Sequence, residues 1–261
     1  MAKLTTTRIL NMINLDFTDL LFGDSYSYNL TTYRVQFSDG SNVYSGTGFT
    51  YEGGVPVSGT VTGIAEYDDE NSAVHKLEGI SISAASMVAA ARTGETNDDE
   101  ALILKALKGN DSVVGSEDGD HLFAGAGNDL IKGNGGDDTI LSGAGADRFV
   151  GGTGRDFFTF AAVSDSTPSL ATRDTILDFS RVSGNMDTID LSAIDANTKV
   201  SGNQSFSFIG TRSFSGSGGE LKYVSKASDS WVLADVNGDK KVDFAIHFDD
   251  AITFTSGMFW L

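Results

Sequence analysis

Aspartate recurs at a fixed interval of nine residues through the middle of the chain. Glycine stands two positions before the aspartate in five of the six repeats, and a large apolar residue stands two positions after it in all six. Evenly spaced carboxylates in glycine-rich turns suit a hard divalent cation such as Ca²⁺, which takes about six to eight oxygen ligands. The aspartates that we predict to be metal ligands are Asp111, Asp120, Asp129, Asp138, Asp147 and Asp156.

Each nine-residue repeat must place its aspartate on a turn and its apolar residue on a strand. A six-residue turn followed by a three-residue strand leaves one inward-facing side chain per repeat. Two repeats then form one coil of a parallel β-roll, so aspartates 18 residues apart lie over each other on the same edge. The residues predicted to fill the core are Val113, Leu122, Ile131, Ile140, Phe149 and Phe158.

Such a roll is predicted to fold only when calcium is present. One core residue in nine cannot offset an ordering cost of roughly 1 to 2 kcal/mol per residue, and stacked carboxylates repel each other without a cation. Pairing each aspartate with the one 18 residues later gives about four sites. The turn positions predicted to complete them are Gly109, Asp118, Gly125, Gly127, Asn134, Gly136, Gly143, Gly145, Gly152 and Gly154.

The composition excludes several classes of partner and site. With 36 acidic and 18 basic residues the net charge is −18, which disfavours nucleic acid and anionic membranes. The absence of cysteine removes disulfides, thiolate nucleophiles and cysteine zinc sites. No window reaches the roughly 20 apolar residues of a membrane span, and the N-terminus does not read as a secretory signal peptide.

The repeats divide the chain into three predicted domains: 1–108, 109–159 and 160–261. The first is expected to be an antiparallel β domain with strands near 33–37, 42–46 and 57–67. Two short helices should follow, one over 83–93 with Gly94 as its C-cap and one capped by Asn97 and Glu100. Segment 164–174 reads as an irregular connection, and 174–261 as a β-rich cap closing the roll. The predicted fold class is therefore mainly β.

The repeats resemble the RTX, or hemolysin-type, calcium-binding family, whose nonapeptide is Gly-Gly-x-Gly-x-Asp-x-apolar-x. GGTGRDFFT at 151–159 matches it best. The C-terminal region resembles the domain that follows the repeats in serralysin-type proteases, through the stretches DTILDFS, NMDTIDLSAIDA, GNQSFSFIGTRSFSGSGGELKY and ADVNGDKKVDFAI. The resemblance implies calcium ligation by the repeats, an extracellular location, and export by type I secretion machinery through a C-terminal signal, ITFTSGMFWL.

Two further acidic groups are candidate calcium ligands. The resemblance favours ligation by the group Asp178, Asp187 and Asp190. The second group lies between residues 235 and 243, and its acidic and amide residues alternate with other residues as at the start of an EF-hand loop. The twelfth position of such a loop, however, is Ile246 instead of glutamate. Its Asn-Gly pair is equally typical of a β-hairpin turn, and we favour that structural interpretation. The residues of the second group are Asp235, Asn237, Asp239 and Asp243.

The sequence offers no catalytic residues that we can name. It has only His75, His121 and His247, with no HExxH zinc motif and no G-x-S-x-G nucleophile elbow. We therefore expect a non-enzymatic extracellular module whose N-terminal domain contacts a cell surface, a polysaccharide or another protein. The alternative is a small secreted hydrolase or polysaccharide lyase with catalytic carboxylates in 1–108, and a secreted toxin ranks third.

Aromatic residues are frequent in the strands expected between residues 26 and 51. They could form a carbohydrate-binding face, because aromatic rings combine an apolar body with a polar group. Aromatic residues at such positions are more often part of the core, and we favour that interpretation. The residues concerned are Tyr26, Tyr28, Tyr33, Tyr44, Phe49 and Tyr51.

Overall fold

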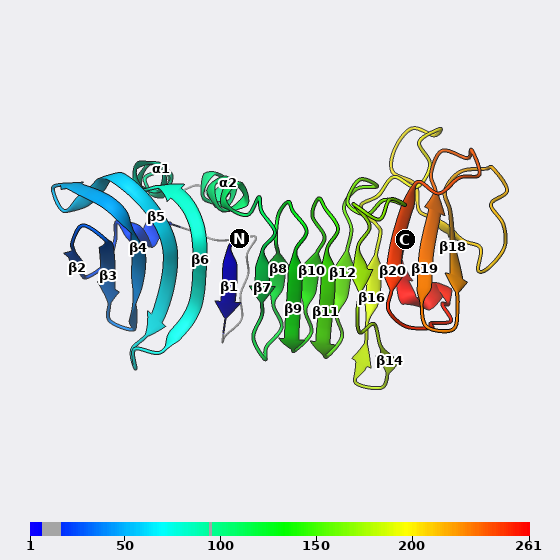
Figure 1. The fold of residues 1–261 in the computed structure, drawn as a ribbon, viewed down its shortest axis with the longest axis horizontal. Helices are drawn as coiled ribbons and strands as arrows, with labels where there is room; N and C mark the ends of the chain where they lie inside the picture. Colours follow the sequence, from blue (N-terminus) through cyan, green and yellow to red (C-terminus); the bar gives the residue numbers. More distant parts are fainter. Residues whose placement is uncertain (7–16, 94–95) are drawn as a thin grey trace.

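A computed structural model describes residues 1–6, 17–93 and 96–261 of the chain. The chain is mainly β, as predicted, and its strands follow one another along the longest axis of the molecule (Figure 1). Most of them belong to one 14-stranded sheet, which a five-stranded parallel sheet faces across the roll. None of the described helices is long and apolar enough to cross a membrane.

The middle of the molecule is the predicted parallel β-roll. Its strands are β7 (Ser112–Val114), β8 (His121–Phe123), β9 (Leu130–Gly135), β10 (Thr139–Leu141), β11 (Arg148–Thr153) and β12 (Phe157–Thr159). Strands β7, β9 and β11 pair in parallel in one sheet, and β8, β10 and β12 in the other. Val113 lies beside Ile131, and Leu122 beside Ile140. Residues 18 apart are therefore neighbours, which confirms the two-repeat coil.

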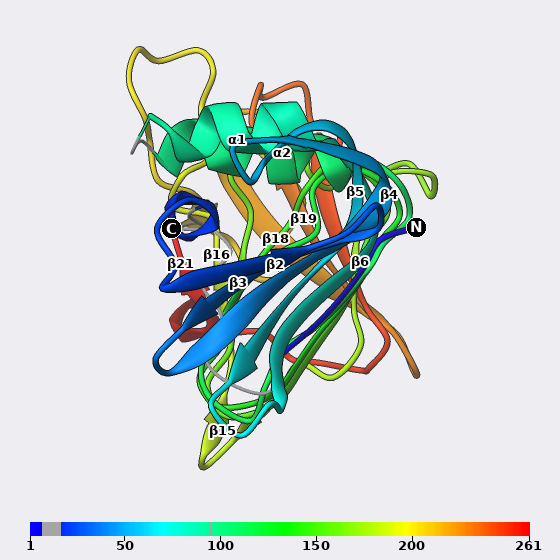
Figure 2. The same cartoon turned by 90° about the vertical axis from the view of Figure 1, so that its left-hand side faces the viewer.

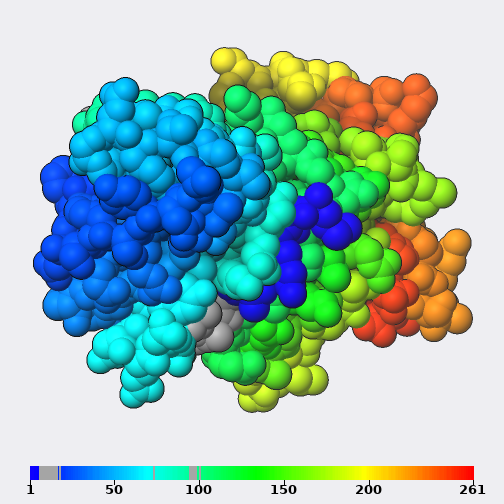
Figure 3. Space-filling view, turned by 60° about the vertical axis from the view of Figure 1, so that its left-hand side comes forward, coloured from blue at the N-terminus to red at the C-terminus, as the bar shows by residue number. Residues whose placement is uncertain are grey.

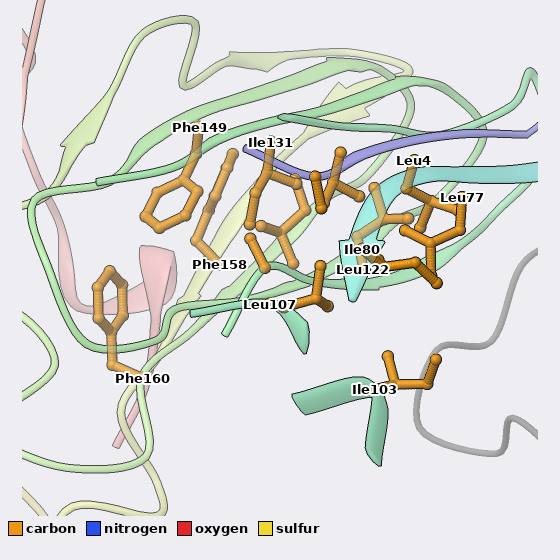
Figure 4. Packing of buried hydrophobic residues seen from close by; sticks show 14 of the residues in the cluster. Leu4, Leu77, Ile80, Ile103, Leu107, Leu122, Ile131, Phe149, Phe158 and Phe160 are labelled. Atoms are coloured by element: carbon orange, nitrogen blue, oxygen red, sulfur yellow. The ribbon is translucent and has the colours of Figure 1, made fainter. Parts of the chain in front are cut away.

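The second residue of each roll strand points into the core, as the period predicted. All six are at most 1% exposed, and the rings of Phe149 and Phe158 face each other at 6.2 Å. This stack continues past the repeats, because Leu4 and Leu107 cover one end and Phe160 covers the other (Figure 4). The core is thus thin in cross-section but continuous with the apolar residues of both flanking parts.

The N-terminal part is a curved antiparallel sheet. Its strands are β2 (Ser25–Tyr28), β3 (Thr32–Phe37), β4 (Gly40–Glu52), β5 (Val55–Asp68) and β6 (Ala73–Ser83). They pair in sequence order, and β2 is the edge strand of the whole sheet. The predicted strands near 33–37, 42–46 and 57–67 are confirmed. A 3-10 turn, η2 (Thr18–Leu20), precedes β2.

A short strand at the start of the chain, β1 (Lys3–Thr6), joins this sheet to the roll. It pairs antiparallel with β6 and parallel with β7. Leu4 lies beside Leu77 on one side and Val113 on the other. The N-terminal sheet and one sheet of the roll are therefore a single continuous sheet.

Helices α1 (Ala84–Ala91) and α2 (Thr96–Ala106) lie along the same side of the molecule (Figure 2). Ser83, predicted as the first residue of this helix, instead caps α1, since its Oγ accepts from the amide of Ser86 at 3.4 Å. The helix ends at Ala91, earlier than predicted, because the Thr93 amide and Oγ1 both bond to the carbonyl of Ala90 and close a tight turn. Helix α2 begins at Thr96, so the predicted cap Asn97 lies within the helix. Gly94 and the side chains of residues 97 and 100 lie outside the described residues.

The C-terminal part extends both sheets of the roll and then closes it. Its strands are β13 (Thr175–Ile176), β14 (Arg181–Val182), β15 (Asn185–Met186), β16 (Thr188–Asp190), β17 (Ser207–Phe208), β18 (Glu220–Ser225), β19 (Ser230–Asp235), β20 (Phe244–Phe248) and β21 (Phe259–Trp260). Strands β13 and β20 continue the sheet of β11, and β16 and β21 continue that of β12. The antiparallel strands β18 to β20 then form the predicted cap.

Candidate calcium sites along the edges of the roll

The aspartates of the repeats lie in two rows, one along each edge of the roll. We name them the Asp111 ladder (Asp111, Asp129, Asp147 and Asp174) and the Asp120 ladder (Asp120, Asp138, Asp156 and Asp187). Within each ladder the backbone amide of one aspartate donates to Oδ1 of the next, at 2.7–3.2 Å. Ala2 precedes the first ladder, and its amide donates to Asp111 Oδ1. The coil geometry thus brings together the six aspartates singled out by the sequence.

The second carboxylate oxygen of several ladder aspartates is buried without a partner. Among the described residues, no hydrogen-bond donor reaches Oδ2 of Asp111, Asp129, Asp138 or Asp156. These residues are at most 4% exposed, and an unpaired buried carboxylate oxygen is costly. Four such oxygens in two rows indicate that a cation belongs beside them.

Asp120 is an exception at the start of its ladder. Its Oδ2 accepts from the amide of Ser116 at 2.6 Å and from the Ser116 hydroxyl at 3.0 Å. Ser116 occupies a turn position that holds glycine in the last repeat, Gly152. The protein itself therefore satisfies the first carboxylate of the Asp120 ladder.

The glycines allow the turns of successive coils to approach closely. A Cβ on Gly127 would lie 1.8 Å from the carbonyl oxygen of Gly109, and one on Gly145 would lie 1.6 Å from that of Gly127. Gly145 also has φ +150°, a conformation that L side chains rarely adopt. Asn134 takes a similar left-handed conformation, with φ 80°, and its Nδ2 donates to the carbonyl of Gly115 at 2.7 Å.

A second set of glycines cradles the carboxylates of the Asp120 ladder. A Cβ on Gly133 would lie 2.0 Å from Asp138 Oδ2, and one on Gly151 would lie 2.2 Å from Asp156 Oδ2. Gly133 and Gly151 were not among the residues predicted from the sequence. They stand five residues before the aspartate in alternate repeats. Aligning the sequence with itself at an offset of 18 residues would therefore have found them.

Burial raises the pKa values of several ladder carboxylates, because the charged form loses its contact with water. It raises the pKa of Asp129 and Asp138 from 3.8 to about 7, and the neighbouring ladder aspartates add to the shift. The pKa of Asp156 is raised to about 6 and that of Asp187 to about 7, again chiefly by burial. The ladders therefore concentrate carboxylates that are costly to ionise without a counter-ion.

The ladders end on aspartates outside the nine-residue repeats. Asp174 Oδ1 accepts from the amide of Asp147 at 2.8 Å, and its Oδ2 from the Ser142 hydroxyl at 2.6 Å. It is fully buried, and burial raises its pKa to about 8. Sequence analysis missed it as a site residue, although Asp-Thr-Ile at 174–176 repeats the tripeptide at 138–140. Asp187, which was predicted, begins the same tripeptide at 187–189.

The remaining predicted residues after the roll lie in two different settings. Asp178 lies beside the end of the Asp120 ladder, where it accepts from the amides of Gly151 and Gly152, both at 2.9 Å. The Asp190 carboxylate instead accepts from the amide and hydroxyl of Ser192, at 2.9 and 2.6 Å. Asp190 is therefore not part of either ladder.

The acidic loop between β19 and β20 binds its own backbone. Asp235 accepts from the amides of Gly238 and Lys240 at 2.6 and 2.9 Å, and Asp243 accepts from Val236 and Asn237. The flanking strands pair antiparallel, with Ala234 beside Phe244, as the hairpin interpretation expected. The connection spans 236–243, however, and is longer than a two-residue Asn-Gly turn. Asp239, at its tip, contacts Lys241.

The donor set of the ladders suits calcium. In the described part of the chain, no three acidic or histidine side chains form a cluster able to hold a metal by themselves. Stacked turns instead offer two carboxylates and several close-packed carbonyls, which are the hard oxygen ligands that calcium prefers. The orphaned oxygens and the glycine-lined turns therefore fit this ion.

Comparison with known protein families finds a match that covers residues 72–258. The matching model is described as the C-terminal part of the peptidase M10 serralysins. Its range includes both ladders and ends close to β21. No protein in the curated set matches the chain.

Comparison with solved structures gives matches to repeat subunits of one enzyme. The AlgE6R2 subunit of the mannuronan C5-epimerase of Azotobacter vinelandii is 23% identical, with a TM-score of 0.42, over 59% of this chain and 88% of that one. The AlgE6R3 subunit is 24% identical, with a TM-score of 0.38, over 54% and 71%.

Proposed function

The chain belongs to the peptidase M10 serralysin C-terminal family, and from this premise we propose that it is a secreted, non-enzymatic module that folds on calcium outside the cell. As a member of the family it is a calcium-binding β-roll module. The observation that carries the proposal is the pair of aspartate ladders with buried, unpartnered Oδ2 atoms. We assign calcium ligation to these ladders, including Asp174 and Asp187, and to the carbonyls of the stacked turns.

Calcium would supply the positive charge that the stacked carboxylates need. The chain's own residues then fix the register, because each ladder amide donates to the carboxylate of the next coil. If each ion were about tenfold saturated, linkage would contribute roughly 1.4 kcal/mol per ion. Four ions would then contribute an amount comparable to the whole stability of many domains, which is roughly 5–15 kcal/mol.

The position of the last strand supports export of the chain before it folds. Strand β21 pairs with β16, Phe259 is buried, and Trp260 packs on Phe157 with ring centroids 4.9 Å apart. The buried apolar face of this segment, which includes Phe254 and Phe259, is accessible only while the chain is unfolded. Low calcium inside the cell would keep it unfolded, and the type I secretion machinery would then be able to bind the segment.

The side chains of His75 and His247 bind carboxylates outside the two ladders. His121 is exposed on β8, His75 pairs with Glu66 at 2.7 Å, and His247 pairs with Asp229 at 2.9 Å. None of these ion-pair partners belongs to a ladder. The N-terminal sheet, held by the calcium-loaded roll, is then the part that contacts a surface, a polysaccharide or another protein.

Calcium titration followed by far-UV circular dichroism and small-angle scattering tests the folding proposal. We expect β structure to appear cooperatively as the radius of gyration falls, and excess chelator to reverse both changes. Secretion is tested separately, by expressing the chain with and without residues 252–261 beside a type I exporter. A spectrum that chelator leaves unchanged would refute calcium-dependent folding. Turnover of polysaccharide or casein by the folded chain would refute the non-enzymatic role.

A further inference from the structure

A hollow of about 250 Å³ opens at the end of the molecule farthest from the cap. Its walls are Leu21, Tyr26, Tyr28 and Tyr33 together with the Gly53–Val55 turn. These residues belong to the N-terminal end of the molecule, which is shown in blue in the space-filling view (Figure 3). The hollow lies on edge strand β2 and is remote in sequence from both aspartate ladders.

The tyrosines around the hollow form a set of nearly parallel rings. Tyr26 stacks on Tyr33 at 5.9 Å with 23° between the planes. Tyr28 stacks on Tyr51 at 4.3 Å with 30°, and Tyr51 stacks on Tyr33 at 6.1 Å with 29°. Tyr33 is buried, whereas Tyr26 is 39% and Tyr28 50% exposed. The expected core role therefore holds for Tyr33, Tyr44 and Phe49, while Tyr26 and Tyr28 remain open to solvent.

Hydrogen bonds hold most of these rings in place. Tyr33 donates to the carbonyl of Leu20 at 3.2 Å, and Tyr51 donates to that of Asn29 at 2.7 Å. The Tyr26 hydroxyl accepts from the amide of Gly23 at 2.9 Å. For the Tyr28 hydroxyl, no partner occurs in the described part of the chain. Rings held in place in this way can stack on a ligand, and the Tyr28 hydroxyl can form a hydrogen bond with it. Little side-chain conformational entropy is lost on binding, because the rings are already fixed.

The charge around the hollow selects against acidic ligands. None of the lining residues that the structure describes is charged. The exposed Asp24 directly precedes β2, and the exposed Glu52 directly precedes the Gly53–Val55 turn. The one basic residue between positions 9 and 75 is Arg34. It points to the other face of the sheet, where it donates to Ser41 Oγ at 2.7 Å and covers the ring of Tyr67. An uncharged ligand fits this setting, and a polyuronate would be repelled.

We propose that this hollow binds a neutral pyranose unit of a polysaccharide. The apolar C–H face of the sugar ring would stack on Tyr26 and Tyr28, since these rings present flat apolar faces. Its hydroxyls would bond to the Tyr28 hydroxyl and to the open backbone at Gly53 and Gly54. The size, slightly below the range of about 300–1,000 Å³ for drug-sized ligands, suits one sugar ring. The inference rests on the proposed non-enzymatic role and narrows its partner to a neutral glycan.

Affinity electrophoresis of the calcium-loaded full chain tests the site. The gels would contain dextran, galactomannan or mixed-linkage β-glucan, with polygalacturonate as the acidic comparison. We expect at least one neutral polysaccharide to retard the chain and polygalacturonate not to. Y26A and Y28A should each weaken the binding roughly two- to tenfold. Y28F should keep most of it, because the ring remains, and L170A, at a distant exposed residue, should change nothing.

The alternative outcomes separate this site from the proposed function. Neutral-glycan binding that survives the Y26A/Y28A double change would place the ligand elsewhere and overturn the site alone. A chain that folds with calcium but binds no neutral glycan, or binds only polygalacturonate, would also overturn it. So would a dimer in analytical ultracentrifugation that Y28A dissociates, since a second copy would then occupy the hollow. Circular dichroism of each variant with calcium shows that it is folded.

Discussion

Four ladder aspartates divide their two carboxylate oxygens between two roles. In Asp111, Asp129, Asp138 and Asp156, Oδ1 accepts a backbone amide and Oδ2 remains for the ion. Sequence spacing alone predicted which aspartates stack, because the nine-residue period fixes the coil. It did not predict this division, which depends on the backbone direction of each turn.

Asp138 and Asp137 provide a matched pair for testing the ladder. Asp138 is fully buried and belongs to two stacked pairs, whereas Asp137 is 49% exposed and forms an ion pair with Arg155. We expect D138N to raise the calcium midpoint of folding about tenfold or more, because two sites lose a charged ligand. D137N should lose only a surface ion pair, worth roughly 0–1 kcal/mol. Equal midpoints for D138N and D137N in a dichroism titration would contradict the ladder assignment.

The raised pKa values predict that protonation of the ladder carboxylates at low pH partly restores folding when calcium is absent. The pKa of Asp129, Asp138 and Asp187 is about 7 in the folded chain against 3.8 ordinarily. A raised folded pKa gives a stabilisation that is complete below about pH 4 and is lost as the pH rises through about 7. In chelator we therefore expect more β structure at pH 5.5 than at pH 8, measured at low concentration above the pI of 4.3. Calcium affinity should change in the opposite sense, because protons compete with the ion.

At the scale of elements, the sequence predicted the strands better than the helix ends. Each roll strand is recognised by one inward apolar residue between two outward-facing residues, and this pattern is contained within three consecutive positions. The end of α1 depends on a turn closed by Thr93, and the glycine at the next position, Gly94, does not reveal this turn. Strand β1 was not predicted, since four residues carry little pattern and its pairing with β6 and β7 is set by tertiary packing.

Turn stacking predicts that one added methyl group blocks the roll. G145A would place its Cβ 1.6 Å from the carbonyl oxygen of Gly127 and would also strain a φ of +150°. Strain of this kind costs on the order of 1–3 kcal/mol before the clash is counted. We expect G145A to fail to reach the wild-type dichroism signal at saturating calcium. G257A is the control, because nothing lies within 4 Å of its Cβ position, and it should fold normally.

At the scale of the whole molecule, one sheet and one core link all three parts. The sequence suggested separate regions, because the nine-residue repeat begins at residue 109 and stops after residue 159. The continuous sheet arises from β1 and β13, which are too short to be recognised as connecting strands from the sequence. Calcium bound along the roll is therefore expected to stabilise the N-terminal sheet as well.

Natural fluorophores make this coupling measurable. Six of the seven tyrosines lie in the N-terminal part, and Trp231 and Trp260 lie in the cap. With calcium, we expect tyrosine and tryptophan signals to report one thermal transition. L4D should split it into two, because it buries a charge in β1 between the sheet and the roll, an effect of several kcal/mol. L170D, at a residue that is 80% exposed, should leave a single transition, and two transitions in the wild-type chain would refute the coupling.

The direction of the ladder hydrogen bonds limits how such a protein can vary in length. Ala2 offers only an amide at one end, while Asp174 and Asp187 provide different final acceptors at the other. Inserting 18 residues would add one aspartate to each ladder and keep both ends matched. Inserting nine residues would exchange the final acceptors of the two ladders. The Asp120 ladder, which is lined by Gly133 and Gly151, would then end on Asp174 instead of Asp187. Growth of the roll by whole coils, in even numbers of repeats, is therefore the only change in length that preserves both edges.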